Sequence, residues 1–237
     1  MTGTPTSKPD RSGDDGTIDR THLLLVGAGP GLGVAVARRF AVGGYRVTLV
    51  ARSKDKLADL VGSLSDTGAE VATIEADASD PEGLGARLAV LYRGERAPGV
   101  IIYNAVMGAP DQLLSATVDH LQAAYAVDVI SAIVVAQVAA PAMKAAGFGT
   151  MIVTGGGFAD HPIPTLATVS LGKAALRSAA TMLGADLEPD GIRVATLTIA
   201  GQIVAGTAFD PARIAERYWD VVQPDGPWQA EFRFTGE

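Results

Sequence analysis

Four glycines stand between an apolar run and an amphipathic stretch near the start of the chain, within residues 22–52. They are Gly27, Gly29, Gly31 and Gly33, in the segment HLLLVGAGPGLGVAVARRF. Because glycine lacks a Cβ, backbone N–H groups at such a turn can approach a pyrophosphate. The positive end of a following helix stabilises that phosphate without a cationic side chain. These residues therefore predict the binding of a dinucleotide.

The elements on either side of the glycines have the order that such a site needs. Residues 23–26 form a short continuous apolar run, typical of a strand that is buried on both faces of a parallel sheet. Apolar residues then recur at helical spacing over 34–41, and Gly43 and Gly44 end that helix before a second strand at 45–50. Together these residues predict one βαβ unit.

Strands and helices alternate along the rest of the chain. We expect helices over 53–65, from 79 onward, over 117–146 and over 168–188, and strands at 70–74, 100–103, 149–154 and 192–199. Alternation of this kind predicts an α/β protein with a single-domain Rossmann fold, a doubly wound parallel sheet with helices on both faces. The tail at 228–234 alternates like a strand that packs on this or a neighbouring subunit.

The ends of the chain differ from its centre in composition. Residues 1–20 are rich in small and polar types and almost free of large apolar ones, which predicts a flexible arm. The domain then runs over 21–237 and includes a loop and helix at about 200–222 and a tail at 223–237.

The composition excludes several kinds of site. The chain has 237 residues and no cysteine, which excludes disulfides, thiol catalysis and cysteine metal sites. Its formal charge of −7 argues against a nucleic-acid partner, and three scattered histidines predict no metal site. Because residues 1–20 have no apolar centre, they do not resemble a signal peptide, and we predict a cytoplasmic protein.

The stretch 117–146 is apolar nearly all round and could be mistaken for a membrane span. Gln122, Asp128 and Gln137 interrupt it, and it lies between two predicted strands. We therefore expect it to be buried between the sheet and a partner subunit, with no membrane involved. The helices 117–146 and 168–188 are too apolar for exposed outer faces, which predicts a homo-tetramer or homo-dimer.

With these motifs in order, residues 22–205 resemble the short-chain dehydrogenase/reductase family. The matching features are the glycine turn, Asp77 after the third strand, Tyr103-Asn104-Ala105, Pro141-x-Met143 and Lys173. The resemblance implies a nicotinamide dinucleotide across the carboxyl ends of the strands. The cofactor-binding residues that follow from the turn and the resemblance are Gly27, Gly29, Pro30, Gly31, Leu32, Gly33, Arg52, Ser53, Asp77, Ala78, Asn104, Ala105, Lys173 and Ile203.

The end of the second strand favours NADP(H) over NAD. Proteins that bind NAD usually place an acidic side chain there, whereas this chain has Ala51-Arg52-Ser53-Lys54. Arg52 could pair with a 2′-phosphate through parallel hydrogen bonds. The alternative is that Arg52 and Lys54 only solvate the start of a helix.

The expected catalytic residues are largely missing. The family has Tyr-x-x-x-Lys, with the tyrosine as general acid/base, but the position four before Lys173 is Val169. The family serine falls within the glycines 155–157, and the family asparagine aligns with Asp128. Only the lysine remains of four groups, so a reaction on this scaffold needs another proton donor.

Lys173, Asp128 and His161 are the candidate catalytic residues. Asp128 could act as an acid if burial raises its pKa, or could distort the helix in a structural role. His161 follows the glycines on a loop that should border the substrate, or is an ordinary surface histidine.

The sequence supports three functions. The first is an NADP(H)-dependent oxidoreductase without the usual tyrosine, acting on a small or medium organic substrate: an imine or iminium, an activated enone or a carbonyl. The second is a non-redox cyclase, dehydratase or isomerase that uses Asp128 or His161, and the third is a nucleotide-binding protein without catalysis.

A stripe of Ile214, Tyr218 and Trp219 is either core or a substrate wall.

Overall fold

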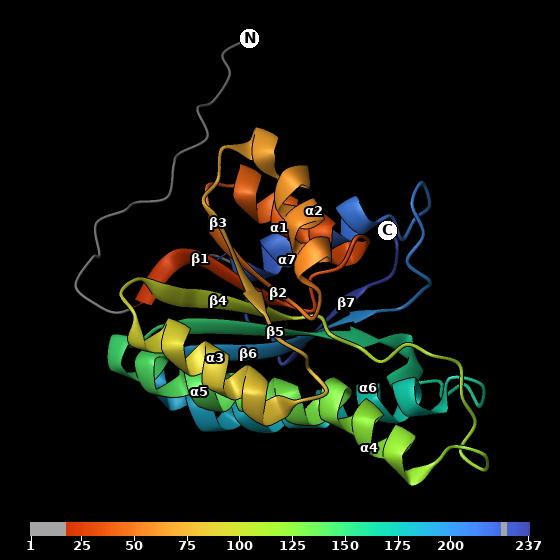
Figure 1. Cartoon of the computed structure of the whole chain (residues 1–237). Coiled ribbons are helices and arrows are strands. Elements are labelled where there is room, and N and C mark those ends of the chain that lie inside the picture. The colour runs from red at the N-terminus through yellow and green to blue at the C-terminus, as the bar shows by residue number, and fades with distance from the viewer. Residues whose placement is uncertain (1–17, 224–226) are drawn as a thin grey trace.

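Seven strands form one parallel sheet in the computed structural model, which describes residues 18–223 and 227–237 (Figure 1). The strands are β1 (Ile18–Val26), β2 (Arg46–Ala51), β3 (Val71–Glu75), β4 (Ala97–Tyr103), β5 (Gly149–Gly156), β6 (Ile192–Ile199) and β7 (Glu231–Phe234). Their order is β3-β2-β1-β4-β5-β6-β7, so the direction of winding reverses between β1 and β4. In such sheets ligands bind outside the carboxyl ends of the strands at that reversal.

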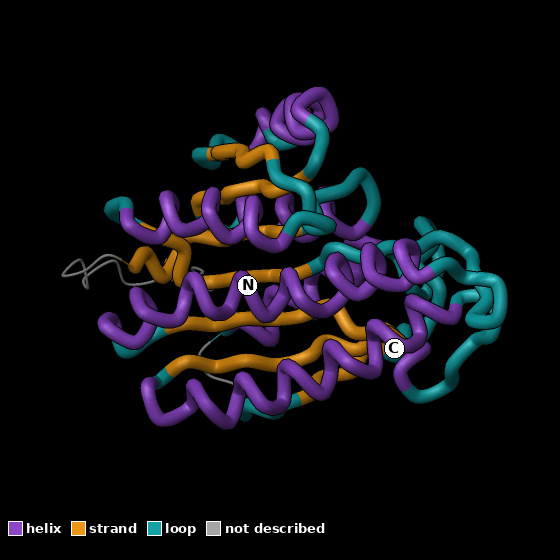
Figure 2. The backbone as a smooth tube through the Cα atoms, turned by 60° about the horizontal axis from the view of Figure 1, so that its bottom comes forward, coloured by secondary structure: helices purple, strands orange, loops and turns teal. Residues whose placement is uncertain are grey.

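Helices cover both faces of the sheet (Figures 1 and 2). One face carries α1 (Leu32–Val42), α2 (Lys54–Ser63) and α7 (Pro211–Val222). The other carries α3 (Pro81–Arg93), α4 (Val118–Tyr125), α5 (Ser131–Ala146) and α6 (Ala167–Leu187). The predicted doubly wound Rossmann fold is therefore confirmed.

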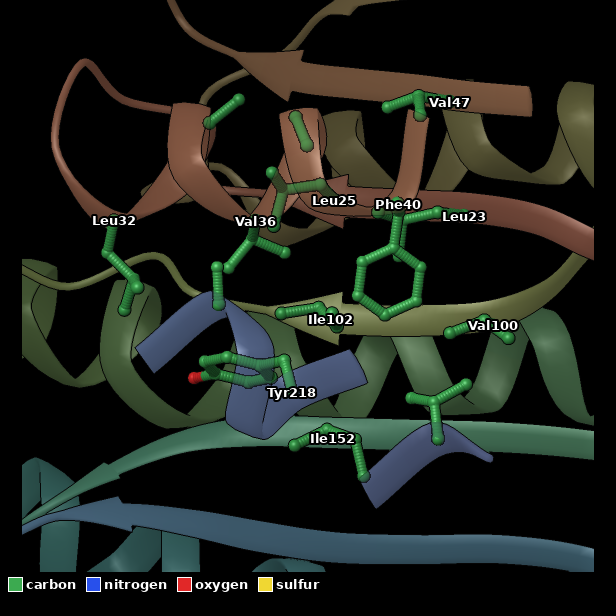
Figure 3. Packing of buried hydrophobic residues seen from close by; sticks show 14 of the residues in the cluster. Leu23, Leu25, Leu32, Val36, Phe40, Val47, Val100, Ile102, Ile152 and Tyr218 are labelled. Carbon is green, nitrogen blue, oxygen red and sulfur yellow. The ribbon is translucent and has the colours of Figure 1, made fainter. Parts of the chain in front are cut away.

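The central strand shows why its sequence is a continuous apolar run. Leu23 and Leu25 pack with α1 and α7, whereas Leu24 and Val26 pack with α3, α5 and α6. Successive side chains of a strand point to opposite faces, so a strand covered on both sides needs apolar residues at every position. Figure 3 shows Phe40 of α1 within the first of these clusters. Burying one such side chain stabilises the fold by about 1.5–3 kcal/mol.

Two helices begin at capping side chains, close to the positions where the sequence predicts helix starts. The Ser53 hydroxyl accepts a hydrogen bond from the Lys56 N–H, and α2 begins at the next residue. The Asp80 carboxylate accepts from the Gly83 N–H at the start of α3. Each cap satisfies a backbone donor that the first helical turn leaves without a partner.

The prediction of a flexible arm over residues 1–20 is wrong for residues 18–20, which belong to a strand. Strand β1 begins at Ile18, whose buried side chain packs in the core beside Ala97. Ile18 and Asp19 pair with the start of β4, and Arg96 forms an ion pair with Asp19 at 2.9 Å. The strand extends into this polar segment because Ile18 is apolar and because β4 supplies the neighbouring strand with which residues 18 and 19 pair. Residues 1–17 lie outside the described residues.

The predicted long helix over 117–146 contains a π-helical turn, η2 (Ala126–Ile130), between α4 and α5. The buried Tyr103 hydroxyl donates a hydrogen bond to the Val127 carbonyl in this turn. The stretch Val118–Ala146 is long and apolar enough to cross a membrane, but half of its most apolar part is buried within the molecule. It packs against α3, α6 and the sheet, as a core helix does.

The C-terminal segments are core elements. Strand β7 pairs in parallel with β6 of the same chain. Ile214 and Tyr218 of α7 are fully buried, and the Trp219 ring packs edge-on against Phe40. The stripe on α7 is therefore core and not a substrate wall, because α1 packs against it and leaves only Trp219 half-buried.

Candidate nucleotide-binding and catalytic site

A cavity of about 630 Å³ opens at the carboxyl ends of the central strands. It is bordered by the segments that follow β1, β2, β3 and β4, which are distant in sequence and meet because the strands are parallel. The predicted cofactor residues that line it are Gly27, Gly29, Arg52, Asp77, Ala78, Asn104 and Ala105. The structure thus brings half of the predicted set to one cavity.

The four glycines of the first turn have two different roles. Gly27 has a φ of +85°, and a Cβ there would lie 2.3 Å from the Ala105 nitrogen. A Cβ on Gly33 would lie 3.1 Å from Ala28. These two glycines permit close packing of the turn. A Cβ on Gly29 or Gly31 would meet no atom within 4 Å, so these two leave open space where a phosphate could approach.

Leu32, predicted to bind the cofactor, has only backbone groups to offer a phosphate. The side chain is buried in the core with Phe40, and only the backbone at the start of α1 remains for a ligand. A helix start suits this role, because its first N–H groups have no partner within the helix.

A second cavity, of about 530 Å³, lies between α1 and α2 and shares Gly29 and Arg52 with the first. The predicted Pro30 and Ser53 line it, together with Lys56, which sequence reasoning missed. Lys56 lies on the first turn of α2, within a turn of Ser53, and this helical spacing was the signal that could have identified it. Arg52 therefore stands at the boundary of two cavities with a second cation nearby.

A chain of hydrogen bonds fixes the side chain of Asn104. Its amide nitrogen donates to the Gly27 carbonyl at 3.0 Å, and its oxygen accepts from the Thr154 hydroxyl at 3.0 Å. Since that hydroxyl donates to Asn104, the buried Tyr218 hydroxyl donates to Thr154, at 2.7 Å. Thr154 and Tyr218 thus hold a predicted cofactor residue in place.

Lys173 lies on α6 and points its ammonium into the molecule. Its Nζ donates to the Thr154 carbonyl at 2.6 Å, and its side chain is buried. Burial lowers the pKa of Lys173 to about 8, although the negative charge of Asp128 acts in the opposite direction. The ammonium has two further donors beyond the one given to Thr154.

Asp128 lies in the π-helical turn η2 and is also buried. Its Oδ1 accepts from the Met107 N–H at 2.8 Å, and burial raises its pKa against the opposing effects of that bond and of Lys173. A Cβ on Gly172 would lie 2.7 Å from this carboxylate, so α6 needs a glycine there. Within the described residues, Asp128 and Lys173 form no direct ion pair.

The positions of the missing serine and tyrosine lie close to Lys173. Val169 is buried one turn earlier on α6. A Cβ on Gly156 would lie 3.5 Å from Phe158 and 3.7 Å from the Lys173 Cγ, which is ordinary contact. The site therefore has room for a small side chain beside the lysine, but neither residue present carries a transferable proton.

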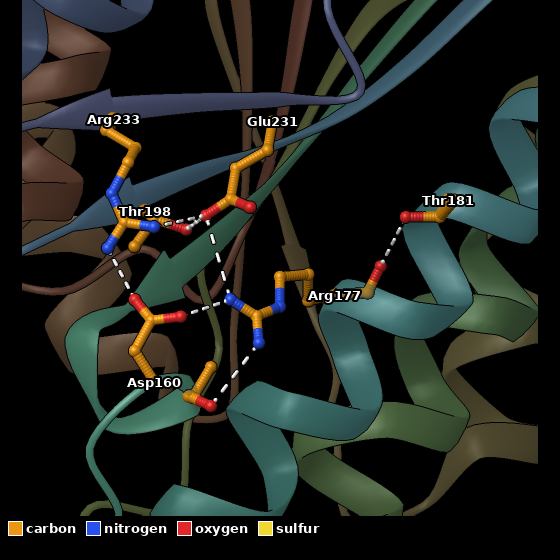
Figure 4. A network of polar contacts seen from close by, with 7 residues as sticks. Asp160, Arg177, Thr181, Thr198, Glu231 and Arg233 are labelled. Carbon is orange, nitrogen blue, oxygen red and sulfur yellow. Dashed lines mark hydrogen bonds and ion pairs between the residues drawn. The ribbon is translucent and has the colours of Figure 1, made fainter.

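His161 and Ile203 are both exposed, and neither borders the two cavities described above. The loop before His161 is held by Asp160, which pairs with Arg177 at 2.5 Å and with Arg233 (Figure 4). Hydrogen bonds from Arg233 and Arg177 lower the pKa of Asp160 to about 2. This network joins α6 and β7 to the loop and leaves His161 at the surface.

A second anchored loop follows β4, and sequence reasoning missed its anchor, Asp111. This carboxylate accepts hydrogen bonds from the Thr168 hydroxyl, the Thr168 N–H at 3.1 Å and His120 Nε2 at 2.8 Å. Partial burial raises the pKa of Asp111, but these bonds outweigh it and lower the pKa to about 2. The loop after β4 is thereby fixed to the start of α6.

Comparison with known proteins agrees with this architecture. The family model described as short chain dehydrogenase matches residues 21–210. The chain belongs to the short-chain dehydrogenase family. This short-chain dehydrogenase is 27% identical over 178 residues to the oxidoreductase asL5 of Sarocladium schorii. The aligned residues cover 75% of this chain and 70% of that protein.

Two solved structures show the same fold. A short-chain dehydrogenase from Rhodopseudomonas palustris superposes with a TM-score of 0.80 at 25% identity, covering 91% of this chain and 98% of that one. A metagenomic short-chain oxidoreductase in complex with NADP gives a TM-score of 0.81 at 23% identity, covering 92% and 99%. The predicted family is thus confirmed by sequence and by fold.

Proposed function

We propose that this short-chain dehydrogenase is an NADP(H)-dependent oxidoreductase that works without the acid/base tyrosine of its family. The observation that carries the proposal is the buried Lys173, whose ammonium remains at the site although Val169 and Gly156 offer no proton beside it. Burying a lysine is costly because burial disfavours its charge, so a lysine kept in this position is a candidate for a functional role.

The two cavities support NADP(H) as the cofactor. Gly29 and Gly31 leave the space that a pyrophosphate needs, and the cations of Arg52 and Lys56 border the adjoining cavity. The metagenomic structural neighbour is in complex with NADP, which agrees with this choice. When bound, the nicotinamide would supply or accept a hydride.

The side chains around Lys173 then limit which substrates can react. Asn104 is held by Gly27 and Thr154, and Lys173 is held by the Thr154 carbonyl, so this part of the site is rigid before any ligand arrives. A substrate that needs little protonation suits such a site: an imine or iminium, an activated enone, or a carbonyl with its own acid. We propose Asp128 as the reserve proton donor, because burial raises its pKa.

Asp128 also favours a second candidate function, a non-redox cyclase, dehydratase or isomerase on the same scaffold. Burial raises the pKa of the Asp128 carboxyl, so this group is a candidate to hold and transfer a proton in a reaction that involves no hydride. Turnover of a substrate without NADPH would support this function, with His161 as the other proton carrier. A protein that binds NADPH but turns over nothing would be a nucleotide-binding protein.

Substituting Arg52→Asp should reverse or abolish a preference for NADPH over NADH. A carboxylate at this position repels a 2′-phosphate and accepts from the 2′-hydroxyl of NADH. Fluorescence titration of both cofactors, together with NADPH oxidation in a substrate screen, measures the preference and the redox activity. The matched control is Arg87→Asp, an exposed arginine of α3 that borders neither cavity. Equal affinities of the unmodified protein for the two cofactors would contradict the assignment.

We also propose a homo-oligomer formed through the outer face of α4, η2 and α6. This face exposes Val118, Tyr125, Ile130, Leu171 and Met182, each at least 41% exposed. Of these, Tyr125, Ile130 and Leu171 line an apolar hollow of about 430 Å³. Contiguous apolar surface of this kind is typical of subunit contacts. The cytoplasmic location inferred from the composition stays a prediction.

The variant Leu171→Glu should lower the oligomeric state, because a charge buried at an interface has no partner there. Light scattering at micromolar concentration measures the mass, and Val42→Glu is the control because Val42 is comparably exposed on α1. A monomeric unmodified protein, or an oligomer that Leu171→Glu leaves intact, would rule out this interface.

A further inference from the structure

Three loops at the carboxyl edge of the sheet carry an unusual share of exposed apolar side chains. They follow β4, β5 and β6 and span residues 104–117, 157–166 and 200–210. Six large apolar residues on them are at least 39% exposed, and we call this set the apolar rim: Val106, Leu113, Leu114, Ile163, Ile203 and Val204. Single exposed apolar residues are normal on proteins, but a group on neighbouring loops indicates a binding surface.

The loops of the apolar rim adjoin one another and the large cavity. The loop after β4 meets the loop after β5 where the Asp111 N–H donates to the Thr165 carbonyl at 3.1 Å. The loop after β5 meets the loop after β6 at Gly157, where a Cβ would lie 3.6 Å from the Ala200 Cα. Val106 itself lines the 630 Å³ cavity. The rim is therefore continuous with the site proposed for the cofactor.

The same three loops contain no lysine and no arginine. Their carboxylates are already engaged: Asp111 with Thr168 and His120, Asp160 with two arginines, and Asp210 with the Gly206 and Ala212 N–H groups. Arg177 and Arg233, which reach the loop after β5, are themselves paired with Asp160. Arg213, at the start of α7, lies close enough to the engaged Asp210 to help lower the pKa of that carboxyl. His161 is the single titratable side chain that these loops leave exposed.

These observations oppose an anionic substrate. A protein that recognises a carboxylate or phosphate places arginine, lysine or backbone N–H groups where the anion lies. Here the fixed cations of Arg52 and Lys56 border the cofactor cavities and not the apolar rim. An acidic substrate at the rim would lose hydration without gaining a partner, and a net charge of −7 would repel it.

The loop after β6 also leaves the rim open. Residues 200–210 join β6 to α7 without a helix of their own, and α7 packs against α1 on the far side of the sheet. Gly156 and Gly157, at the end of β5 and the start of the next loop, add no side chains that would narrow this opening. A substrate larger than a few atoms can therefore extend from the reacting centre over the rim.

We propose that the substrate is an uncharged molecule with a bulky apolar part that lies on the apolar rim while its reacting group enters beside Lys173. The proposal rests on the function proposed above and specifies its substrate class. Apolar contact over the rim would favour longer substrates by about fourfold for each methylene group that is fully buried. A carboxylate at the far end of the same molecule would reduce the affinity.

Three β-keto methyl esters, which share one reacting group, test this proposal: one with a long alkyl chain, one with the same chain ending in a carboxylate, and methyl acetoacetate. Binding to the NADPH-loaded protein is measured by calorimetry, and turnover by NADPH oxidation. We expect the neutral long ester to bind at least ~10-fold more tightly than either of the other two. Equal or tighter binding of the carboxylate, or of methyl acetoacetate, would overturn the proposal.

Variants locate the effect at the rim. Leu114→Lys should raise the affinity for the terminal carboxylate at low salt and lower that for the neutral long ester, whereas Val90→Lys, an equally apolar exposed position on α3, should change neither. If Leu114→Lys leaves the ratio of the two affinities unchanged, the apolar part of the substrate binds elsewhere, and the proposal that it lies on the apolar rim is wrong. Binding of the long ester without NADPH oxidation would instead count against the proposed redox function and leave the substrate class supported.

Discussion

Replacing Val169→Tyr and Gly156→Ser together should raise the reduction of a simple ketone by about 10²–10⁴-fold, the usual contribution of a well-placed acid/base. Val169 lies one helical turn before Lys173, so a tyrosine there would share the face of α6 that carries the ammonium. A side chain at position 156 would contact Phe158 and Lys173 at ordinary distances. The positive charge of Lys173 would then lower the pKa of the new phenol.

NADPH oxidation with a simple ketone measures this gain, and Gly156→Ser alone is the control, because serine without the tyrosine supplies no acid of suitable strength. Circular dichroism and NADPH titration show whether the double variant folds and binds cofactor. A folded, NADPH-binding double variant without ketone reduction would show that position 169 does not face the reacting group.

Substituting Lys173→Ala should weaken NADPH binding by about 1.5–3 kcal/mol, or roughly 10–150-fold, as expected for a lost hydrogen bond to a charged group. The Lys173 ammonium gives one proton to the Thr154 carbonyl and has two others for the ribose hydroxyls. Lys173→Met keeps most of the buried volume and separates this effect from a cavity. Unchanged affinity in both variants would mean that the cofactor does not lie against α6.

The same lysine predicts how stability depends on pH. Burial lowers its pKa to about 8 in the folded state, below the ordinary lysine value of 10.5 that the unfolded chain should have. Between about pH 8 and 10.5 the unfolded state therefore binds more protons, and this group makes the free energy of unfolding rise with pH. Lys173→Met should remove that rise, which urea titrations at pH 8 and pH 10 would measure. A slope that persists in the variant would assign the effect to another group.

Local patterns were sufficient to predict most of the fold. The continuous apolar run 23–26 predicted a strand covered on both faces, and the helices predicted from 53 and from 79 begin within two residues of those positions. The glycines of the first turn border the cavity at the carboxyl ends of the strands, the place that the family resemblance implied for a dinucleotide. Each of these features depends on residues within one or two turns of the chain, so the sequence order carries the information directly.

Other features were decided by the tertiary structure alone. The sequence did not reveal that Thr154 and Tyr218, 64 positions apart, support Asn104, or that Asp111 anchors one loop to α6 through Thr168. Nor did it distinguish core from substrate wall on α7, because an apolar stripe has the same periodicity whether α1 or a ligand covers it. What the sequence determined was the type and order of the elements and the position of the glycine-rich turn between β1 and α1. Which distant side chains meet, which are buried and which pKa values shift depends on packing between elements, and these contacts exist only once the sheet has formed.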